Sequence, residues 1–285
     1  MSDETSKKVE RVDAHQHFWV YSKEEYGWMD SSMGVLMRDY LPDNLLPILE
    51  EYKIDGSIAV QARPSLEENE FLLKLSQMNP KILGIVGWLD FCGSGLEEKL
   101  ERYNSYQVIK GYRAMVQDMP KPSKFLKSEP FNKGVAILQN TGKLYELLIK
   151  ENDLPAAVSF CQRHDRAAIV LCHMGKPIVP KGDMCFWEEH LKELAALSHV
   201  SVKISGIVTE AYWGKWTKAQ LVPYLVMALE AFGPERVLFG SDWPVCLLSA
   251  SVKDVYSLAC EATNIFSDHE KELFWGKNAV RIYKL

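Results

Sequence analysis

Four residues that can bind a metal or transfer a proton stand at the ends of apolar runs in the sequence. His15 and His17 follow Val12-Asp-Ala, His173 follows Ile-Val-Leu-Cys, and Asp242 follows Val-Leu-Phe-Gly-Ser. Residues i and i+2 of an extended segment point to the same side, so His15 and His17 present their imidazoles together. Imidazoles can hold a divalent metal or polarise a carbonyl group, and a carboxylate can take a proton from water. A single histidine or aspartate in such a place is commonly structural, so the chemistry depends on a fold that gathers all four.

Short β-branched runs alternate along the chain with longer amphipathic stretches, which predicts alternating strands and helices. Several strands are continuously apolar, as is typical of parallel strands covered on both faces. The predicted strands are Val9–Ala14, Gly56–Gln61, Ile82–Leu89, Val108–Val116, Leu144–Ile149, Ala168–His173, Val200–Ser205 and Arg236–Ser241. The predicted helices are Leu66–Met78, Leu96–Tyr103, Leu154–His164, Trp187–Leu197 and Lys218–Phe232, with one or two more in Asp268–Tyr283.

Eight such strands in 285 residues predict an α/β fold, a single (β/α)8 TIM barrel over residues 9–285, after a disordered N-terminal segment of residues 1–8. An open doubly wound sheet is the structural alternative. The Pro- and Lys-rich stretch Asp118–Pro130 predicts a long loop that could cover a site. In a parallel barrel the catalytic residues lie where strands end, so one face would gather His15, His17, His173 and Asp242.

Composition excludes several classes of function. The net charge is −5 and no Lys/Arg cluster stands out, which argues against nucleic-acid binding. The apolar runs are shorter than the roughly 20 residues that cross a bilayer, and the polar start lacks the core of a secretory signal. We therefore expect a cytoplasmic protein without a membrane partner, with six reduced cysteines. A homodimer is the expected assembly only because it is the commonest one.

Other catalytic signatures are missing from the sequence. No G-x-S-x-G elbow occurs, which disfavours a serine nucleophile. The segment Cys92-Gly-Ser-Gly95 completes neither the Rossmann nor the P-loop spacing, so no nucleotide cofactor is expected.

Longer strings around the candidate residues resemble the amidohydrolase superfamily. The most specific are Asp13-Ala-His-Gln-His-Phe-Trp19, Gly87-Trp-Leu-Asp90 and Gly240-Ser-Asp-Trp-Pro-Val-Cys-Leu-Leu248. With Lys110-Gly-Tyr-Arg113 and Lys203–Glu210, they look like the sugar-lactonase branch, of the L-fuconolactonase and L-rhamnonolactonase type. The resemblance runs from about residue 11 to the last residue. It implies hydrolysis of a sugar (aldonic acid) lactone, with L-fuconolactone or L-rhamnonolactone as the substrate.

The sequence departs from the superfamily in its metal ligands. Where related enzymes add a ligand on the fifth strand, this sequence offers only Tyr145 and Glu146. We therefore expect at most one divalent ion, with zinc the natural candidate, held by His15, His17, His173 and Asp242. The histidine cluster alone is the alternative means of polarising the carbonyl. Such lactonases often have Asp where this chain has Cys172, and strand alternation predicts that Cys172 points away from His173.

The resemblance also suggests substrate contacts. Tryptophan faces stack on sugar C–H groups, while polar side chains near strand ends can bond hydroxyls. The candidates are Arg113, Gln61, Asp90, Trp19, Trp28, Trp213 and Glu210. An ion pair for Arg113 and a turn role for Asp90 remain open, and Trp216 is expected to pack in a helix.

The predicted mechanism has Asp242 as general base for the attacking water. Rival functions on the same barrel are a dicarboxylate lactonase or a metal-dependent decarboxylase. Substrates with several carboxylates require several cations, and only Arg63, Arg113 and Lys203 are obvious, which favours a neutral sugar lactone. A catalytically silent binding protein is a third possibility, although binding alone needs no base such as Asp242.

Overall fold

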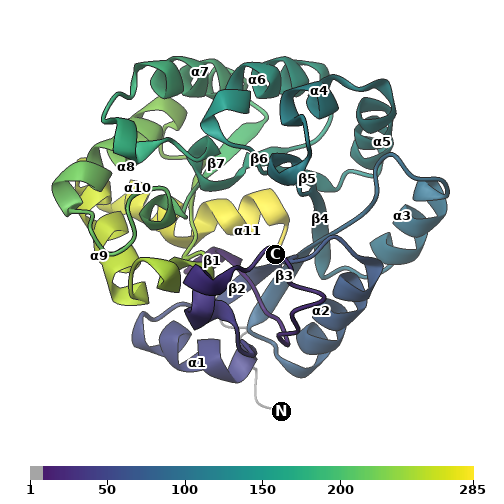
Figure 1. Ribbon diagram of the computed structural model, residues 1–285, viewed down its shortest axis with the longest axis horizontal. Helices are drawn as coiled ribbons and strands as arrows, with labels where there is room; N and C mark the ends of the chain where they lie inside the picture. Colours follow the sequence, from purple (N-terminus) through teal and green to yellow (C-terminus); the bar gives the residue numbers. More distant parts are fainter. Residues whose placement is uncertain (1–8) are drawn as a thin grey trace, which may run out of the picture.

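Eight parallel strands form the centre of the computed structural model, which describes residues 9–285. The predicted N-terminal segment, residues 1–8, lies outside the described residues. In Figure 1 the strands form an inner ring, α1 to α9 form an outer one, and α11 lies across the middle of the view. Each strand pairs with the next, in the order β1 to β8. The strands are β1 Val12–Gln16, β2 Gly56–Val60, β3 Ile82–Gly87, β4 Ile109–Ala114, β5 Leu144–Leu147, β6 Ile169–Leu171, β7 Val200–Ile204 and β8 Val237–Phe239.

The ring closes between β1 and the chain that leaves β8. The Asp242 amide donates to the His15 carbonyl at 2.9 Å, and the His17 amide donates to the Trp243 carbonyl at 2.8 Å. We call these two hydrogen bonds the closing seam. An open sheet would leave both edges unpaired, so the predicted (β/α)8 barrel is confirmed and the doubly wound alternative is wrong.

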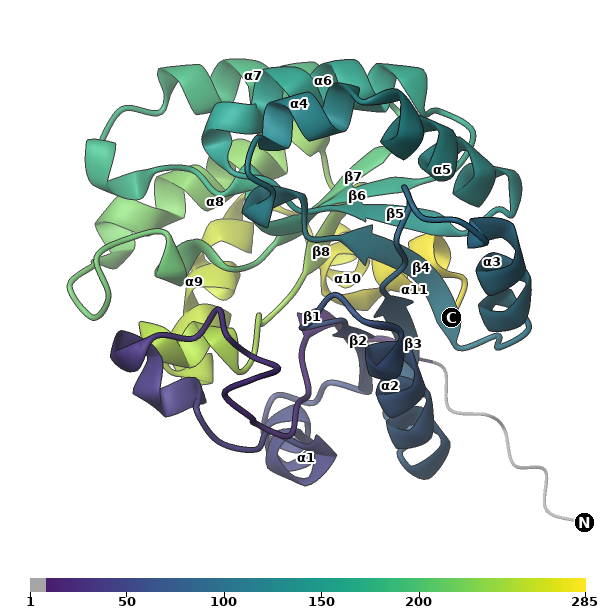
Figure 2. The ribbon, with the colours of Figure 1, turned by 45° about the vertical axis from the view of Figure 1, so that its right-hand side comes forward.

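Helices cover the outside of the barrel, and Figure 2 shows α4 to α8 wrapped around β5 to β8. All the predicted helices are present, with ends within two residues of the prediction. The helices are α1 Pro42–Glu51, α2 Leu66–Met78, α3 Leu96–Asn104, α4 Pro122–Lys127, α5 Glu129–Asn140, α6 Leu154–Arg163, α7 Cys185–Ala195, α8 Lys218–Phe232, α9 Val252–Ala262, α10 Asp268–Glu272 and α11 Asn278–Tyr283.

The stretch Asp118–Pro130 is not the predicted long loop. It contains α4 and the start of α5, and each of these helices has a proline in its first turn. Proline is tolerated there because the first amides of a helix have no intrahelical acceptor. The prolines that suggested a loop therefore mark helix starts.

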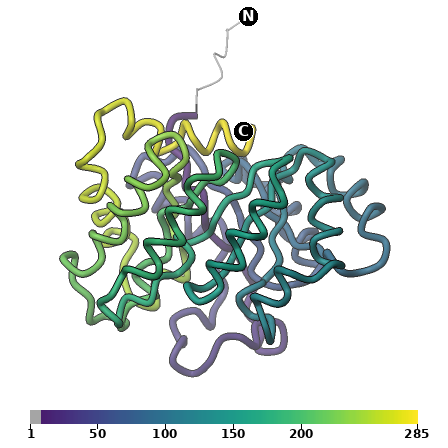
Figure 3. Tube along the Cα trace, turned by 90° about the horizontal axis from the view of Figure 1, so that it is seen from above, coloured from purple at the N-terminus to yellow at the C-terminus, as the bar shows by residue number. Residues whose placement is uncertain are grey.

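The two ends of the barrel differ. At the amino ends of the strands, Ala279 and Tyr283 of α11 pack against interior residues such as Val12 and Leu238. Figure 3 shows α11 on one side of the molecule and the loop between β1 and α1 on the opposite side. The carboxyl ends of the strands, where the candidate residues stand, therefore open on the side away from α11.

Two further observations bear on the compositional expectations. All six cysteines are free, as expected. Among the described residues, every helix is too short or too polar to traverse a bilayer.

Gly134 of α5 tests how tightly the helical layer packs. A Cβ there would lie 2.1 Å from the Phe91 carbonyl oxygen. We expect Gly134→Ala to lower the free energy of unfolding by about 1–2 kcal/mol in urea titrations, because overpacking outweighs the ~1 kcal/mol gain in helix propensity. Gly34→Ala is the control, since nothing lies within 4 Å of its Cβ position. A stabilised Gly134→Ala variant would contradict this packing.

Candidate active site

Asp242 lies at the centre of the three predicted histidines. Its Oδ1 atom is 3.8 Å from His15 Nε2, 3.6 Å from His17 Nε2 and 3.8 Å from His173 Nε2. None of these four residues is more than 5% exposed. The structure thus brings together all four residues that the sequence singled out from three separate strand ends.

The backbone turns sharply where two of these side chains stand. His173 and Asp242 adopt left-handed φ angles of 53° and 57°. Such a φ is uncommon outside glycine, although His and Asp tolerate it better than most residues. Gly206 leaves space for the His173 ring, because a Cβ at position 206 would lie 2.5 Å from His173 Nδ1. The strained turns direct both side chains into the cluster.

Asp13 fastens the closing seam, and sequence reasoning missed it as a site residue. Its Oδ1 accepts from the His15 amide at 3.1 Å and from the Ser241 amide at 2.9 Å. Burial raises the pKa of Asp13 to about 6, although these hydrogen bonds favour the charged form. A signal was available, because Asp13 opens the same string that contains His15 and His17.

The Nδ1 atoms of His15 and His17 fix the hydrogen-bonding roles of these two histidines. His17 Nδ1 donates to the Val60 carbonyl at 2.7 Å, so its Nε2 is an acceptor. His15 Nδ1 accepts from the Lys203 ammonium at 3.1 Å, so its Nε2 is a donor. These two Nε2 atoms are 3.2 Å apart, a matched donor and acceptor. His173 Nδ1 is 2.8 Å from Ser205 Oγ.

Lys203 is fully buried beneath the histidines rather than at the surface. Its ammonium lies 2.6 Å from Glu146 Oε1, which also accepts from the Tyr283 hydroxyl at 2.6 Å. The fifth-strand Glu146 is therefore committed to these partners and is not a free metal ligand. Cys172 Sγ also contacts Glu146 Oε2, at 3.3 Å.

The predicted orientation of Cys172 is wrong. Alternation along a strand would point it away from His173, but β6 ends at Leu171 and a left-handed turn follows. Both side chains are therefore directed into the barrel.

Burial sets the protonation of the cluster. Desolvation lowers the pKa of His173 to about 3, and it also lowers the pKa values of His15 and His17. For Asp242, burial raises the pKa, but the neighbouring His173 and His17 hold it below the ordinary value. At neutral pH the cluster therefore consists of neutral imidazoles around an ionised carboxylate.

A cavity of about 350 Å³ opens above the cluster. Five of the predicted substrate contacts line it, namely Trp19, Trp28, Arg113, Glu210 and Trp213. Gln61 does not: it is buried behind Arg113, whose Nη2 donates to the Gln61 carbonyl at 2.6 Å. Asp90 lies outside the cavity in a turn, where it accepts from the Cys92 amide at 3.0 Å. Trp216 packs in a loop, not a helix, and bonds Ser249.

Five polar residues of the cavity were missed by sequence reasoning. They are Gln117, Asp118, Lys150, Lys176 and Thr209. Lys176 follows the histidine at the end of β6, and Gln117 and Asp118 follow β4, so position at a strand end was the available signal. Lys176 Nζ lies 3.5 Å from Glu210 Oε1. Gln117 Oε1 is buried and has no hydrogen-bond partner among residues 9–285.

The cluster fits one divalent ion in the type and spacing of its donors. Ligand atoms of His15, His173 and Asp242 all lie within 4.8 Å of one another. His17 and His173 bond oxygen through their second nitrogens, as metal-bound histidines usually do. His15 would first have to give up the Nε2 proton that its contact with Lys203 imposes.

Residues 12–285 match the amidohydrolase family. The chain is 41% identical to the L-fucono-1,5-lactonase of Burkholderia multivorans, with 96% of each protein covered. The chain belongs to the amidohydrolase family. The prediction of an enzyme of this superfamily is thereby confirmed.

Solved structures agree with this assignment. A crystal structure of an amidohydrolase from Burkholderia multivorans with bound zinc has a TM-score of 0.93 and 41% identity, covering 96% of this chain and 99% of that one. The 2,6-dihydroxybenzoate decarboxylase from Rhizobium has a TM-score of 0.67 and 14% identity, covering 97% of this chain and 99% of that one. The similarity to the decarboxylase shows only that the two proteins share a fold.

The buried Lys203–Glu146 pair supports a stability prediction. We expect Lys203→Met to cost about 3–5 kcal/mol in urea unfolding, because it leaves the Glu146 carboxylate buried without its cation. The double variant Lys203→Met/Glu146→Leu should be more stable than the single variant. Lys192→Met, which breaks an exposed pair with Glu188, is the control and should cost at most about 1 kcal/mol. Equal effects of Lys203→Met and Lys192→Met would contradict the buried pair.

Proposed function

We propose that this amidohydrolase opens the lactone of a six-carbon aldonic acid, L-fuconolactone first and L-rhamnonolactone second. The observation that carries the proposal is a cavity of balanced charge, walled by tryptophans, above an ionised Asp242. The lactonase name of the Burkholderia multivorans relative supports the same reaction class, hydrolysis of a cyclic ester.

The charges of the cavity favour a neutral substrate. Three cations, Arg113, Lys150 and Lys176, line it together with three carboxylates, Asp118, Glu210 and Asp242. The other cations that sequence reasoning offered are engaged elsewhere: Arg63 pairs with Glu25 and Glu68, and Lys203 pairs with Glu146. A dicarboxylate would leave the lining carboxylates facing like charge, whereas a sugar lactone brings only hydroxyls and an ester.

The walls of the cavity suit a deoxy sugar. Trp19, Trp28 and Trp213 provide flat faces for C–H groups. Lys176 and Glu210 offer a donor and an acceptor to hydroxyls, and the unpartnered Gln117 Oε1 can accept from another. Apolar side chains of the lining, among them Met33, Leu148, Val245 and Leu248, can receive the methyl group.

In the proposed mechanism Asp242 takes a proton from water as the water oxygen attacks the lactone carbonyl carbon. His173 polarises the carbonyl through its Nε2–H if Ser205 donates to Nδ1, and Arg113 adds a second donor from the cavity wall. As the bond between the carbonyl carbon and the ring oxygen breaks, protonated Asp242 returns its proton to that oxygen. The product is the open-chain acid. A divalent ion on the His and Asp donors, when bound, would supply further polarisation of the carbonyl.

The base role of Asp242 is tested by Asp242→Asn. We expect kcat to fall about 100-fold or more, because the amide cannot accept the proton from water. Circular dichroism should show an intact fold, since the change is nearly isosteric. Asp118→Asn is the matched control: it changes another carboxylate of the same cavity and should retain most of the activity. A folded Asp242→Asn enzyme with more than about a tenth of wild-type kcat would remove Asp242 from the role.

The substrate class is tested by initial rates on a panel of lactones. It comprises L-fuconolactone, L-rhamnonolactone, other hexonic lactones, an aromatic lactone and pyrone dicarboxylate, with a pH indicator for released acid. We expect the deoxyhexonic lactones to give the highest kcat/KM. Preference for the dicarboxylate or the aromatic lactone would overturn the sugar assignment. No turnover of any member would favour the decarboxylase or the silent binding protein.

The metal content is a separate prediction. We expect elemental analysis of the purified protein to give at most one divalent ion per chain, zinc by preference, because Glu146 is already bonded to Lys203 and Tyr283. Two ions per chain would contradict the site as described. Activity that survives complete chelation would assign polarisation of the carbonyl to the side chains alone.

A further inference from the structure

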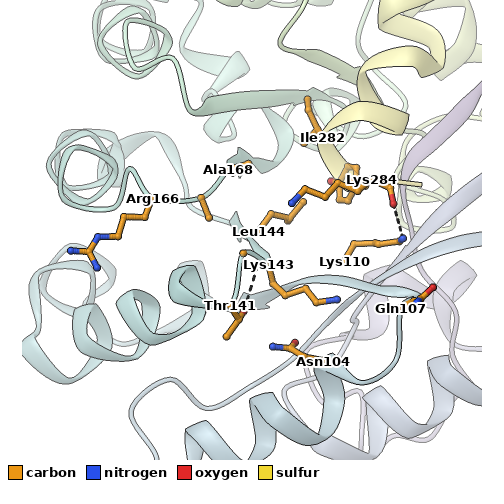
Figure 4. Close-up of a pocket in the computed structure, with 13 residues that line it drawn as sticks. Asn104, Gln107, Lys110, Thr141, Lys143, Leu144, Arg166, Ala168, Ile282 and Lys284 are labelled. Atoms are coloured by element: carbon orange, nitrogen blue, oxygen red, sulfur yellow. Dashed lines mark hydrogen bonds between the residues drawn. The ribbon is translucent and has the colours of Figure 1, made fainter.

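A second cavity, of about 480 Å³, lies at the opposite end of the barrel from the active site (Figure 4). Its residues stand at the amino ends of β4, β5 and β6, at the ends of α3 and α5, and beside α11. The active-site residues stand at the carboxyl ends of the same strands. The two cavities are therefore separated by the length of the barrel.

The lining of this cavity is strongly basic. It includes Lys110, Lys143, Arg166 and Lys284 and no carboxylate side chain among the described residues. Within residues 9–285 none of these four cations forms an ion pair with an aspartate or glutamate. Figure 4 shows the three lysines reaching the middle of the cavity from three separate segments, while Arg166 extends to its outer edge. The cavity thus gathers four cationic side chains that have no aspartate or glutamate partner among residues 9–285.

Hydrogen bonds to the backbone hold two of the lysines in place. Lys110 Nζ donates to the Lys284 carbonyl at 2.9 Å, and Lys143 Nζ donates to the Ile109 carbonyl. An ammonium has three N–H donors, so each of these lysines keeps donors for a ligand. Asn104, Gln107 and Thr141 add uncharged polar groups to the lining.

The C-terminal ends of two helices lie near these cationic side chains. α3 and α5 end at Asn104 and Asn140, next to the cavity, and a helix C-terminus carries about half a negative elementary charge. Burial lowers the pKa of Lys143, and the positive charges of Lys110 and Lys284 lower it further. The three ammonium groups therefore lie close enough to repel one another.

We propose that this basic cavity binds a compact multivalent oxyanion, a phosphate group or a polycarboxylate. An anion with two or three charges can accept hydrogen bonds from several ammonium groups at once and remove their mutual repulsion. The volume lies within the range of small-molecule sites, about 300–1,000 Å³. The proposal does not rest on the lactonase function, because the site lies at the other end of the barrel.

Isothermal titration calorimetry with inorganic phosphate and with citrate, at constant ionic strength in sodium chloride, tests the proposal. We expect saturable binding by the wild-type protein, with the tighter anion identifying the phosphate or the polycarboxylate class. The double variant Lys110→Gln/Lys143→Gln should bind at least about tenfold more weakly, through the loss of two charge-assisted contacts. Lys284→Gln, which changes an exposed side chain and should leave the fold intact, should weaken binding at least about threefold.

Two controls separate this site from general charge and from the active site. The variant Lys74→Gln/Lys133→Gln removes two exposed lysines outside the cavity and should bind the anions as wild type does. The Lys110→Gln/Lys143→Gln variant should keep the lactone kcat/KM. No binding beyond that of chloride, or equal binding by all variants, would overturn the proposal. Binding that persists in the double variant and competes with lactone would place the anion in the active site instead, and would also overturn it.

Discussion

The closing seam between β1 and the chain after β8 is the constraint on which the active site depends. Two backbone hydrogen bonds join His15 to Asp242 and His17 to Trp243. Because three of the four residues in these bonds, His15, His17 and Asp242, are candidate site residues, the contacts that close the barrel also bring the candidate site together. Asp13 reinforces the junction by accepting from both sides of it. If β1 paired one residue out of register with the chain after β8, His15 and His17 would no longer lie opposite Asp242 and Trp243.

Burial then determines what the assembled residues can do. The side chains of the cluster are buried, so the imidazoles stay neutral and Asp242 carries the charge. The Lys203–Glu146 pair below fixes the hydrogen-bonding role of His15, and the Val60 carbonyl fixes that of His17. The single charge facing the cavity from the cluster is therefore a carboxylate, and a base of this kind suits the activation of water.

The sequence predicted the elements well because parallel strands buried on both faces leave uninterrupted apolar runs. The ends of those runs identified the four central residues, since a parallel barrel brings the carboxyl ends of its strands to one face. Residues that depend on long-range contacts were not predictable in the same way. From the sequence alone, Lys203 cannot be told from a surface lysine, because its partner Glu146 lies on another strand. Asp90 and Arg113 are both polar residues near strand ends, and only the position of the cavity shows that Arg113 lines it and Asp90 does not. Alternation failed between Cys172 and His173 because the left-handed turn at His173 directs both side chains inward. Proline misled at α4 because it can start a helix as well as break one.

The most direct test of this account is the pH dependence of kcat/KM for the wild-type enzyme on its best lactone. The pKa of His173 is lowered to about 3 by burial and that of Asp242 is held below its ordinary value of 3.8. A histidine with a lowered pKa stays neutral as the pH falls through 6.5, and a carboxylate with a lowered pKa stays ionised. Asp13 of the closing seam has a pKa of about 6, so the profile is measured for the wild type and for Asp13→Asn. We predict a constant kcat/KM from pH 8 down to about pH 5 in Asp13→Asn, because neither the histidines nor Asp242 titrates in this range. A loss of activity with an apparent pKa near 6.5 that persists in Asp13→Asn would show a titrating histidine and would contradict the buried, neutral cluster around Asp242.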